Sequence, residues 1–284
     1  MFFFLLARGK SLPAGVISQA TFLSNPYLYR QTRTIILFYS KPKNMKSHKL
    51  WVSASFLMLA ALLLSTSLYA QRTTGNGNVV EQERAVGNFD VIKVQKGIDL
   101  YITQGSPAAL TVKADENILD QIITRVDGKT LYLDVQGSVR NARAMDVFVT
   151  LENLSELHAS GGSDVFAEDG LKLKELKLFC SGGSDTRMAI EAETLHCNTS
   201  GGSDAVLSGK VNELIVESSG GSDFDAKKLE AVKCKIRASG ASDAWVFATG
   251  EIDIEASGAS DIHYKGGAKK ISSKASGGAD IHGN

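Results

Sequence analysis

Apolar and polar residues alternate through the second half of the chain, on both sides of a recurring small-residue motif. Three and five residues before the motif lie mostly aliphatic side chains, and the positions between them are mostly polar. This period of two predicts strands with one buried face. The first column is Leu157, Leu178, Cys197, Val216, Ile236, Ile254 and Ser273, and the second is Leu176, Leu195, Leu214, Cys234, Ile252 and Ile271. A second alternation follows the motif, as in DVFA, DAVL, DAWVF and DIHY.

The motif itself is SGGSD, which varies to SGASD and SGGAD, and seven copies lie between Ser160 and Asp280. Successive copies are 21, 19, 19, 20, 18 and 19 residues apart. A unit of this length cannot bury its own apolar face, so units of this kind stack into a solenoid. Glycine allows backbone angles that are closed to other residues, which makes each copy a corner between two strands. We therefore predict an all-β fold, a parallel β-solenoid with coils of about 19 residues.

Residues 79–151 have the same strand-like alternation without the regular motif, whereas 152–284 carry the SGGSD repeat. We expect 79–151 to form irregular N-terminal coils with longer loops, and 115–122 to be a helical turn or a bulge. The expected strands are 89–94, 98–103, 110–114, 130–135 and 146–151.

The segments FDVIKVQKGIDLYITQG, VKADENILDQI and DGKTLYLDV, together with the SGGSD series, resemble the putative auto-transporter adhesin, head GIN domain family. The similarity covers about 79–284. The resemblance implies an exported β-solenoid of the kind common in Bacteroidetes. We expect the chain to depart from a true autotransporter arrangement, because no sorting or membrane-spanning tail is recognisable before Asn284.

The charge is divided unevenly along the chain. Residues 1–70 contain eight Lys or Arg and no Asp or Glu, although the whole chain has 31 of each sign. Residues 45–70 have the basic start, short apolar run and small-residue end of a signal peptide. We expect cleavage after Ala70 and a short linker over 71–78. We also expect Met45 to be the true initiator, so that 1–44 is a mis-called upstream extension; the alternative is a real additional targeting segment. The protein is expected to be exported to the periplasm, the outer membrane or the cell exterior.

The acidic residue of the motif forms the sharpest candidate site. Its copies are Asp164, Asp185, Asp204, Asp223, Asp243, Asp261 and Asp280. Carboxylates stacked about 4.8 Å apart repel one another by roughly 0.9 kcal/mol per pair even in water. Hydrogen bonds from turn amides and serine hydroxyls are the expected compensation. Bound calcium is the alternative, because its preferred ligands are oxygens.

Cysteine and histidine give weaker signals. Cys180, Cys197 and Cys234 fall on inward positions, and an offset along the strands places Cys180 and Cys197 too far apart for a disulfide. We expect three buried thiols. His263 and His282 each follow a motif Asp by two residues. This composition suits zinc, against the simpler interpretation of two exposed histidines.

The outward columns are the expected binding surface. The candidates are Phe166, Phe179, Val206, Ile215 and Trp245. We expect a non-enzymatic, adhesin-like module that presents a rigid face to a glycan or a protein. The alternatives are a polysaccharide-acting β-helix enzyme, which paired carboxylates in a cleft within 79–151 would favour, and a purely structural envelope protein.

Two further expectations concern partners. The mature part is acidic, which argues against nucleic acid as a partner. The C-terminal coil has no polar cap, so we expect it to pair with another chain and support self-association.

Overall fold

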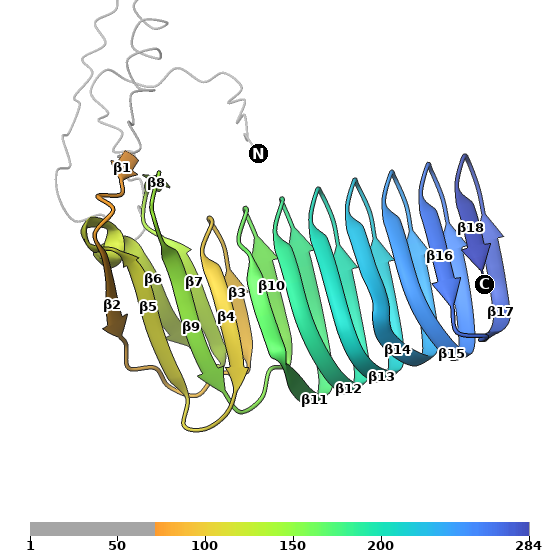
Figure 1. The fold of residues 1–284 in the computed structure, drawn as a ribbon, viewed down its shortest axis with the longest axis horizontal. Coiled ribbons are helices and arrows are strands. Elements are labelled where there is room, and N and C mark those ends of the chain that lie inside the picture. Colours follow the sequence, from red (N-terminus) through yellow and green to blue (C-terminus); the bar gives the residue numbers. More distant parts are fainter. Residues whose placement is uncertain (1–71, 284) are drawn as a thin grey trace, which may run out of the picture. The chain divides into compact units, whose positions relative to one another are not determined.

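A computed structural model of the protein describes residues 72–283, and within them strands predominate (Figure 1). Five long strands pair in parallel with their sequence neighbours, and shorter strands continue the stack on both sides. The prediction of a parallel β-solenoid is confirmed. The strands from the first SGGSD corner onward are β10 (Glu156–Ser160), β11 (Val165–Ser181), β12 (Asp185–Thr199), β13 (Asp204–Ser218), β14 (Asp223–Ala238), β15 (Asp243–Ala256), β16 (Asp261–Lys265), β17 (Lys269–Ala275) and β18 (Asp280–Gly283).

Each coil lies in register with the next, so that equivalent residues form columns along the solenoid. Asp185 pairs with Asp204, and Leu195 pairs with Leu214. The corners line up along the upper edge in Figure 1. We call the outward surface of the strand segments that precede the corners the pre-corner face. The outward surface of the segments that follow the corners is the post-corner face.

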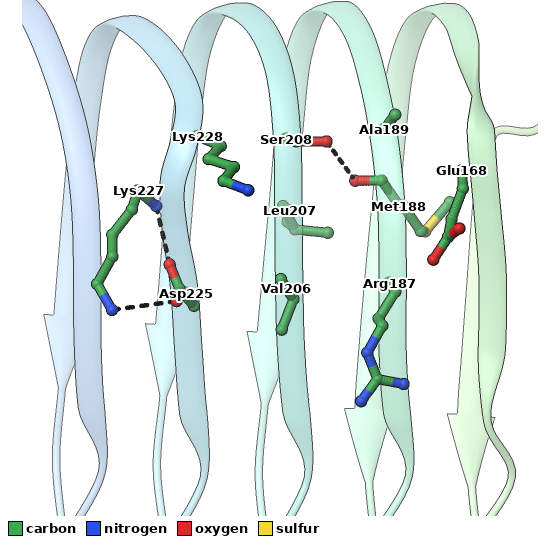
Figure 2. Close-up of a pocket in the computed structure, with 10 residues that line it drawn as sticks. All are labelled: Glu168, Arg187, Met188, Ala189, Val206, Leu207, Ser208, Asp225, Lys227 and Lys228. Carbon is green, nitrogen blue, oxygen red and sulfur yellow. Dashed lines mark hydrogen bonds and ion pairs between the residues drawn. The ribbon is translucent and has the colours of Figure 1, made fainter.

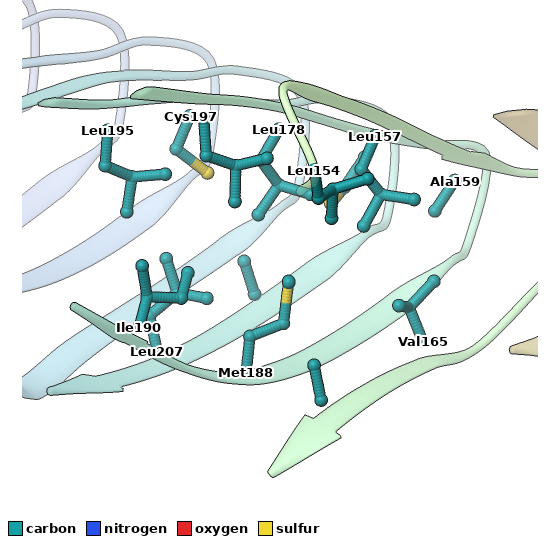
Figure 3. Packing of buried hydrophobic residues seen from close by; sticks show 14 of the residues in the cluster. Leu154, Leu157, Ala159, Val165, Leu178, Met188, Ile190, Leu195, Cys197 and Leu207 are labelled. Atoms are coloured by element: carbon teal, nitrogen blue, oxygen red, sulfur yellow. The ribbon is translucent and has the colours of Figure 1, made fainter. Parts of the chain in front are cut away.

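The core lies between the two layers and is built from the aliphatic columns of the sequence (Figure 3). Leu178, Cys197 and Leu195 point inward from one layer, and Met188 and Leu207 point toward them from the other. All five side chains are buried. The three cysteines are free and buried, as expected, and burial raises the pKa of Cys180 to about 11 and that of Cys234 to about 12.

Serine hydroxyls close the corners from inside. Ser184 is buried, accepts a hydrogen bond from the Ser181 amide at 3.1 Å and donates to the Ala159 carbonyl of the preceding coil at 3.1 Å. Ser203 repeats both bonds with Ser200 and Cys180. The serine at the fourth motif position ties five of the corners to the coil before them, at Ser184, Ser203, Ser222, Ser242 and Ser260, which agrees with its predicted role as a turn hydrogen-bonding group.

The N-terminal coils are not stacked in sequence order. One coil consists of β3 (Val91–Val94) and β4 (Asp99–Gln104), and a later one of β7 (Thr130–Val135) and β9 (Met145–Leu151). The earlier coil lies between the later one and the regular repeat, because β3 pairs with β10 and β7 while β4 pairs with β11 and β9. The segment Gln95–Asp99 occupies the place of an SGGSD corner.

Antiparallel strands close this end of the stack. They are β2 (Val79–Glu83), β5 (Ala109–Asp115) and β6 (Ile122–Asp127). Residues 116–121 form a 3-10 helix, η1 (Glu116–Gln121), so the expectation of a helical turn here is confirmed. The edge strands of a solenoid need such a cover, since unpaired backbone groups invite other chains.

A buried carboxylate fixes the segment that precedes β2. Asp115 is fully buried and accepts hydrogen bonds from the backbone N–H groups of Gly77, Arg143 and Ala144 at 2.7, 2.9 and 3.2 Å. Within the expected linker, β1 (Arg72–Thr74) pairs in parallel with β8 (Ser138–Arg140). The described part of 71–78 is thus attached to the solenoid.

Two expectations lie outside the described residues: the upstream extension over 1–44 and the signal peptide over 45–70. Within residues 72–283, no helix has both the length and the apolar character needed to span a bilayer.

Candidate functional site

The motif carboxylates form one column along the corner edge, and the column is longer than the repeat. Asp99 pairs with Asp146, and the pairing of Leu100 with Val165 places Asp99 beside Asp164. Direct pairs also join Asp223 to Asp243 and Asp261 to Asp280. Nine aspartates therefore share the column: Asp146, Asp99, Asp164, Asp185, Asp204, Asp223, Asp243, Asp261 and Asp280.

Hydrogen bonds between coils partly compensate the repulsion in this column. The Asp185 amide donates to Oδ1 of Asp164 at 3.3 Å, and the amides of Asp223 and Asp261 donate in the same way to Asp204 and Asp243. The compensation is incomplete. Burial and the charges of Asp164 and Asp204 raise the pKa of Asp185, and burial and the charges of Asp204 and Asp243 raise that of Asp223.

A metal site requires several ligands that converge on one point. In the part of the chain that the structure describes, no group of three or more His, Cys, Asp or Glu side chains could hold a metal ion. The motif aspartates are spread along an edge instead. Calcium binding by this column stays a prediction, which we test below.

The post-corner face carries a second column, two residues after the aspartates, with aromatic rings at both ends. Near the N-terminal end, Tyr101 stacks on Phe148 at 4.8 Å and on Phe166 at 5.0 Å between ring centroids. Near the C-terminal end, His263 stacks on Trp245 at 5.6 Å and on His282 at 4.8 Å. Phe166 and Trp245 thus belong to separate stacks on one face, and the two histidines contribute to the second stack.

Between the two stacks the column contains smaller or charged residues, and the surface is hollowed there. Arg187, Val206 and Asp225 are neighbours on three successive strands. They line a groove of about 380 Å³, shown in Figure 2. Val206 is 44% exposed on this surface. The full lining is Glu168, Arg187, Met188, Ala189, Val206, Leu207, Ser208, Asp225, Lys227 and Lys228.

A second hollow of about 360 Å³ shares the lining residue Lys227 with the first. Its other lining residues are Trp245, Val246, His263, Tyr264, Lys265, His282 and Gly283. We call the two together the post-corner groove. It follows the solenoid axis from β11 to β18.

Three cations of the groove lie over aromatic rings. The distances to the ring centroids are 5.7 Å for Arg187 over Phe166, 4.2 Å for Lys227 over Trp245 and 4.9 Å for Lys265 over Phe247. Lys227 also contacts Asp225 at 3.1 Å. Among the described residues, Arg187, Lys228 and Lys265 have no carboxylate within 4.0 Å of a side-chain nitrogen. Most of the positive charge of the groove is therefore open to a ligand.

The pre-corner face is different, and it holds the other two candidates. Phe179 stacks on His158 at 4.5 Å, and Ile215 lies two strands further along. Arg237 on this face contacts Glu255 at 3.2 Å and Glu217 at 4.0 Å. The five sequence candidates therefore do not form one surface. Phe166, Val206 and Trp245 share the post-corner face, and Phe179 and Ile215 share the pre-corner face.

A pocket of about 310 Å³ in the N-terminal coils contains two acidic residues, Asp90 and Glu152. Asp90 contacts the Lys129 ammonium at 3.3 Å. A glycoside hydrolase needs one protonated carboxyl group as general acid. It uses a second carboxylate as well, and in this pocket Asp90 is already held by the Lys129 ammonium.

The C-terminal coil exposes strand edges within the described residues. There β17 pairs only with β15, and β18 pairs only with β16. Ile271 of β17 is more than half exposed. Self-association through this coil stays a prediction.

The site residues predicted from the sequence did not include Asp99, Asp146, Tyr101 and Phe148. A signal was present: Asp99, Asp146 and Asp164 each begin a triplet of aspartate, aliphatic residue and aromatic residue. These triplets fall on neighbouring strands and supply three adjacent carboxylates and one complete ring stack.

Comparison with known proteins identifies one matching family and several solved structures with a similar fold. The family described as putative auto-transporter adhesin, head GIN domain, matches residues 88–268. No curated protein is similar to the chain.

The solved structures that resemble the chain share its fold at low sequence identity. A putative adhesin from Bacteroides fragilis has 23% identity and a TM-score of 0.70, covering 75% of this chain and 100% of its own. A putative adhesin from Parabacteroides merdae has 17% identity and a TM-score of 0.62, covering 75% and 99%. A putative lipid binding protein from Parabacteroides distasonis has 20% identity and a TM-score of 0.55, covering 75% and 100%.

Proposed function

The chain belongs to the putative auto-transporter adhesin, head GIN domain family, and from this premise we propose that it is an exported, non-enzymatic binding module. Its ligand, a glycan or a protein of the cell envelope or cell surface, lies along the post-corner groove. The solenoid acts as the rigid support of that surface.

The observation that carries this proposal is the arrangement of the post-corner face. One ring stack lies beside the groove and the other lines it, and the groove exposes the apolar side chain of Val206 and cations without carboxylate partners. Rings held by stacking and side chains held over rings lose little conformational freedom when a ligand arrives. On the pre-corner face the stacked ring pair is Phe179 with His158, and Arg237 contacts two carboxylates.

Export rests on the signal-peptide pattern of residues 45–70. Secretion of a tagged full-length chain, followed by N-terminal sequencing, tests it. We expect the mature protein outside the cytoplasm with Gln71 as its first residue.

A non-enzymatic role is supported by the environment of the acidic pocket, where Lys129 contacts Asp90. We expect no new reducing ends when the purified protein is incubated with soluble polysaccharides. Release of oligosaccharides that Asp90→Asn abolishes would establish the enzyme alternative.

The binding proposal is tested with the purified protein on immobilised envelope material and on a glycan array. Trp245→Ala on the post-corner face should weaken binding at least ten-fold. Phe179→Ala on the pre-corner face is the matched control, since it also removes a partly exposed ring from a stacked pair.

Both variants must show cooperative unfolding like that of the parent protein. Equal losses in the two variants, or no binding to any envelope or glycan sample, would refute the post-corner groove as the ligand surface. A purely structural role would then be the better interpretation.

A further inference from the structure

We propose that the post-corner groove binds an acidic polysaccharide in which sugars bearing a carboxylate alternate with neutral sugars. This inference rests on the proposed function and specifies the chemical class of its ligand. It follows from the spacing of the cations, the lack of carboxylate partners at Arg187, Lys228 and Lys265, and the apolar positions between them.

The cations of the groove lie on alternate coils. Arg187 lies on β12, Lys227 and Lys228 on β14, and Lys265 on β16. Neighbouring strands are about 4.8 Å apart, so positive charge recurs about every 9.6 Å along the axis. This repeat is close to the length of an extended disaccharide. A polymer with one carboxylate on every second sugar therefore matches the groove, with one anionic group for each second coil.

The coils between the cations present apolar surface instead. Val206 on β13 lies between Arg187 and Asp225 of the two neighbouring strands. Trp245 on β15 pairs with Asp225 from the other side. One face of a pyranose ring consists largely of C–H groups, and such a face packs on exposed aliphatic or aromatic groups. Val206 and Trp245 are therefore placed for the neutral sugars.

The ring geometry limits how Trp245 makes that contact. One ring face lies against the Lys227 ammonium and the other against His263, with an angle of 6° between the planes of Trp245 and His263. A sugar therefore meets the outer edge of this stack. The main apolar contact is assigned to Val206, which is the open floor of the groove.

The charges of the groove are available and oriented. Contact with an aromatic ring holds a cation in place and leaves its charge uncompensated, whereas a carboxylate would neutralise it. Arg187 has this contact with Phe166, and its guanidinium can bind a carboxylate through two parallel hydrogen bonds. Of the two acidic lining residues, Asp225 contacts Lys227, which leaves Glu168 as the one that opposes an anion near Arg187.

The aspartate column borders the groove on its corner side. A polyanion is repelled from that edge. Lys228 and Lys265 lie further from it along their strands, and Arg187 lies two residues after Asp185. The two columns therefore confine an acidic chain to the axis of the groove. A neutral glycan would gain nothing from this arrangement of charges.

The test measures binding of the purified protein to three probes by calorimetry at low salt. The first is an unsulfated chondroitin octasaccharide, in which glucuronate alternates with N-acetylgalactosamine. The second is an N-acetylglucosamine octamer, which is neutral and of similar length. The third is a polyglutamate peptide with the same number of carboxylates. We expect the chondroitin probe to bind at least ten-fold more tightly than either of the others.

Two double variants with the same change of charge locate the site. Arg187→Gln with Lys228→Gln on the post-corner face should weaken chondroitin binding at least ten-fold, as expected for the loss of charge-assisted hydrogen bonds. Lys177→Gln with Lys235→Gln on the pre-corner face should leave it unchanged. Thermal unfolding of each variant shows whether the fold is kept, and Lys265→Gln alone gives a second, milder test at the other end of the groove.

Equal affinity for chondroitin and polyglutamate, equal affinity for the neutral octamer, or equal losses in the two double variants would each overturn the proposal. If chondroitin does not bind while Trp245-dependent binding to envelope material persists, the ligand class is wrong and the proposed function stands. If both kinds of binding are absent, both proposals fail.

Discussion

The two glycines of the SGGSD motif have different roles, and the residue scale shows why one of them varies. The first glycine has a positive φ in all seven copies, for example +81° at Gly220. The second has a positive φ only at Gly162 and Gly183, and in two later copies it is alanine. The amide of this second residue donates to the preceding coil, as from Ala241 to the Gly220 carbonyl at 2.7 Å. The motif therefore tolerates a side chain at its third position and not at its second.

Gly220→Ala and Gly221→Ala form a matched pair that tests this difference. A Cβ at Gly220 would lie 2.8 Å from the Gly201 carbonyl oxygen at a positive φ, whereas at Gly221 the nearest atom is 3.8 Å away. We expect Gly220→Ala to lower the free energy of unfolding by about 2 kcal/mol. Gly221→Ala should be neutral or raise it by up to about 1 kcal/mol. Urea unfolding of both variants measures this, and similar losses would contradict the assignment.

Asp185 lies between two charged neighbours, and its titration should oppose folding at neutral pH. Burial and the charges of Asp164 and Asp204 raise its pKa in the folded protein. Its contribution to stability is therefore fully present below the unfolded pKa, about 3.9, and is lost as the pH rises through the folded value. We expect Asp185→Asn to raise the free energy of unfolding at pH 7 by on the order of 1 kcal/mol.

The gain should disappear near pH 3, where the native carboxyl group is protonated. Asp169→Asn, on the exposed bend of β11, is the control and should have little effect at either pH. Denaturant unfolding between pH 3 and pH 7 gives the profile. A loss of stability at pH 7 in Asp185→Asn would show that the carboxylate makes a favourable contact, which would point to a bound cation.

At the scale of elements, local patterns predicted the strands and nonlocal pairing decided the rest. Alternation around the corners identified the aliphatic columns, and all the members from Leu157 to Ile254 are buried as expected. The order of the N-terminal coils could not be predicted, because it depends on which strand β3 joins and not on its own sequence. The same limit applied to the binding candidates. Phe166 and Phe179 both point outward. They lie on different faces because β11 has an irregularity between Ala167 and Leu171, which separates the segments that carry them.

Asp115 holds the segments around Gly77 and Arg143 at the N-terminal end of the solenoid, and removal of its carboxylate should loosen both segments. Burial would raise the pKa of Asp115, but the amides of Gly77, Arg143 and Ala144 hold it below its usual value. The stabilisation is therefore present above the unfolded pKa and is lost as the pH falls through the folded value. Asp115→Ala leaves three amides without their acceptor, and we expect a loss of about 3 kcal/mol.

Hydrogen exchange gives the sharper readout for this variant. The Gly77, Arg143 and Ala144 amides should lose protection in Asp115→Ala, while amides of β13 and β14 keep theirs. Asp127→Ala, whose exposed carboxylate contacts Arg125, is the control. Unchanged exchange at Gly77 would show that the segment is held by the β1–β8 pairing instead.

At the scale of the whole molecule, the solenoid has three long surfaces with different charge. The corner edge carries the nine aspartates, the pre-corner face holds the ion pairs of Arg237, and the post-corner face carries two ring stacks together with Arg187 and Lys265. Register makes this possible, because any residue that recurs at one position of the coil becomes a column. In a repeat of about 19 residues, the side chain at one position of the coil therefore determines the charge or polarity of a surface along the whole axis.

The aspartate column either binds metal ions or keeps its carboxylates close together without them, and the two cases can be distinguished. Amides of the next coil donate to Asp164, Asp204 and Asp243, and no metal-binding group converges within residues 72–283. We expect calcium, magnesium and sodium at equal ionic strength to raise the melting temperature equally, since all three screen the repulsion. Thermal unfolding in excess EDTA and in millimolar calcium measures this. A rise specific to calcium, lost in Asp204→Asn with Asp243→Asn, would show that the corner carboxylates form a calcium site, and the corner edge would then bind metal as well as set the register of the coils.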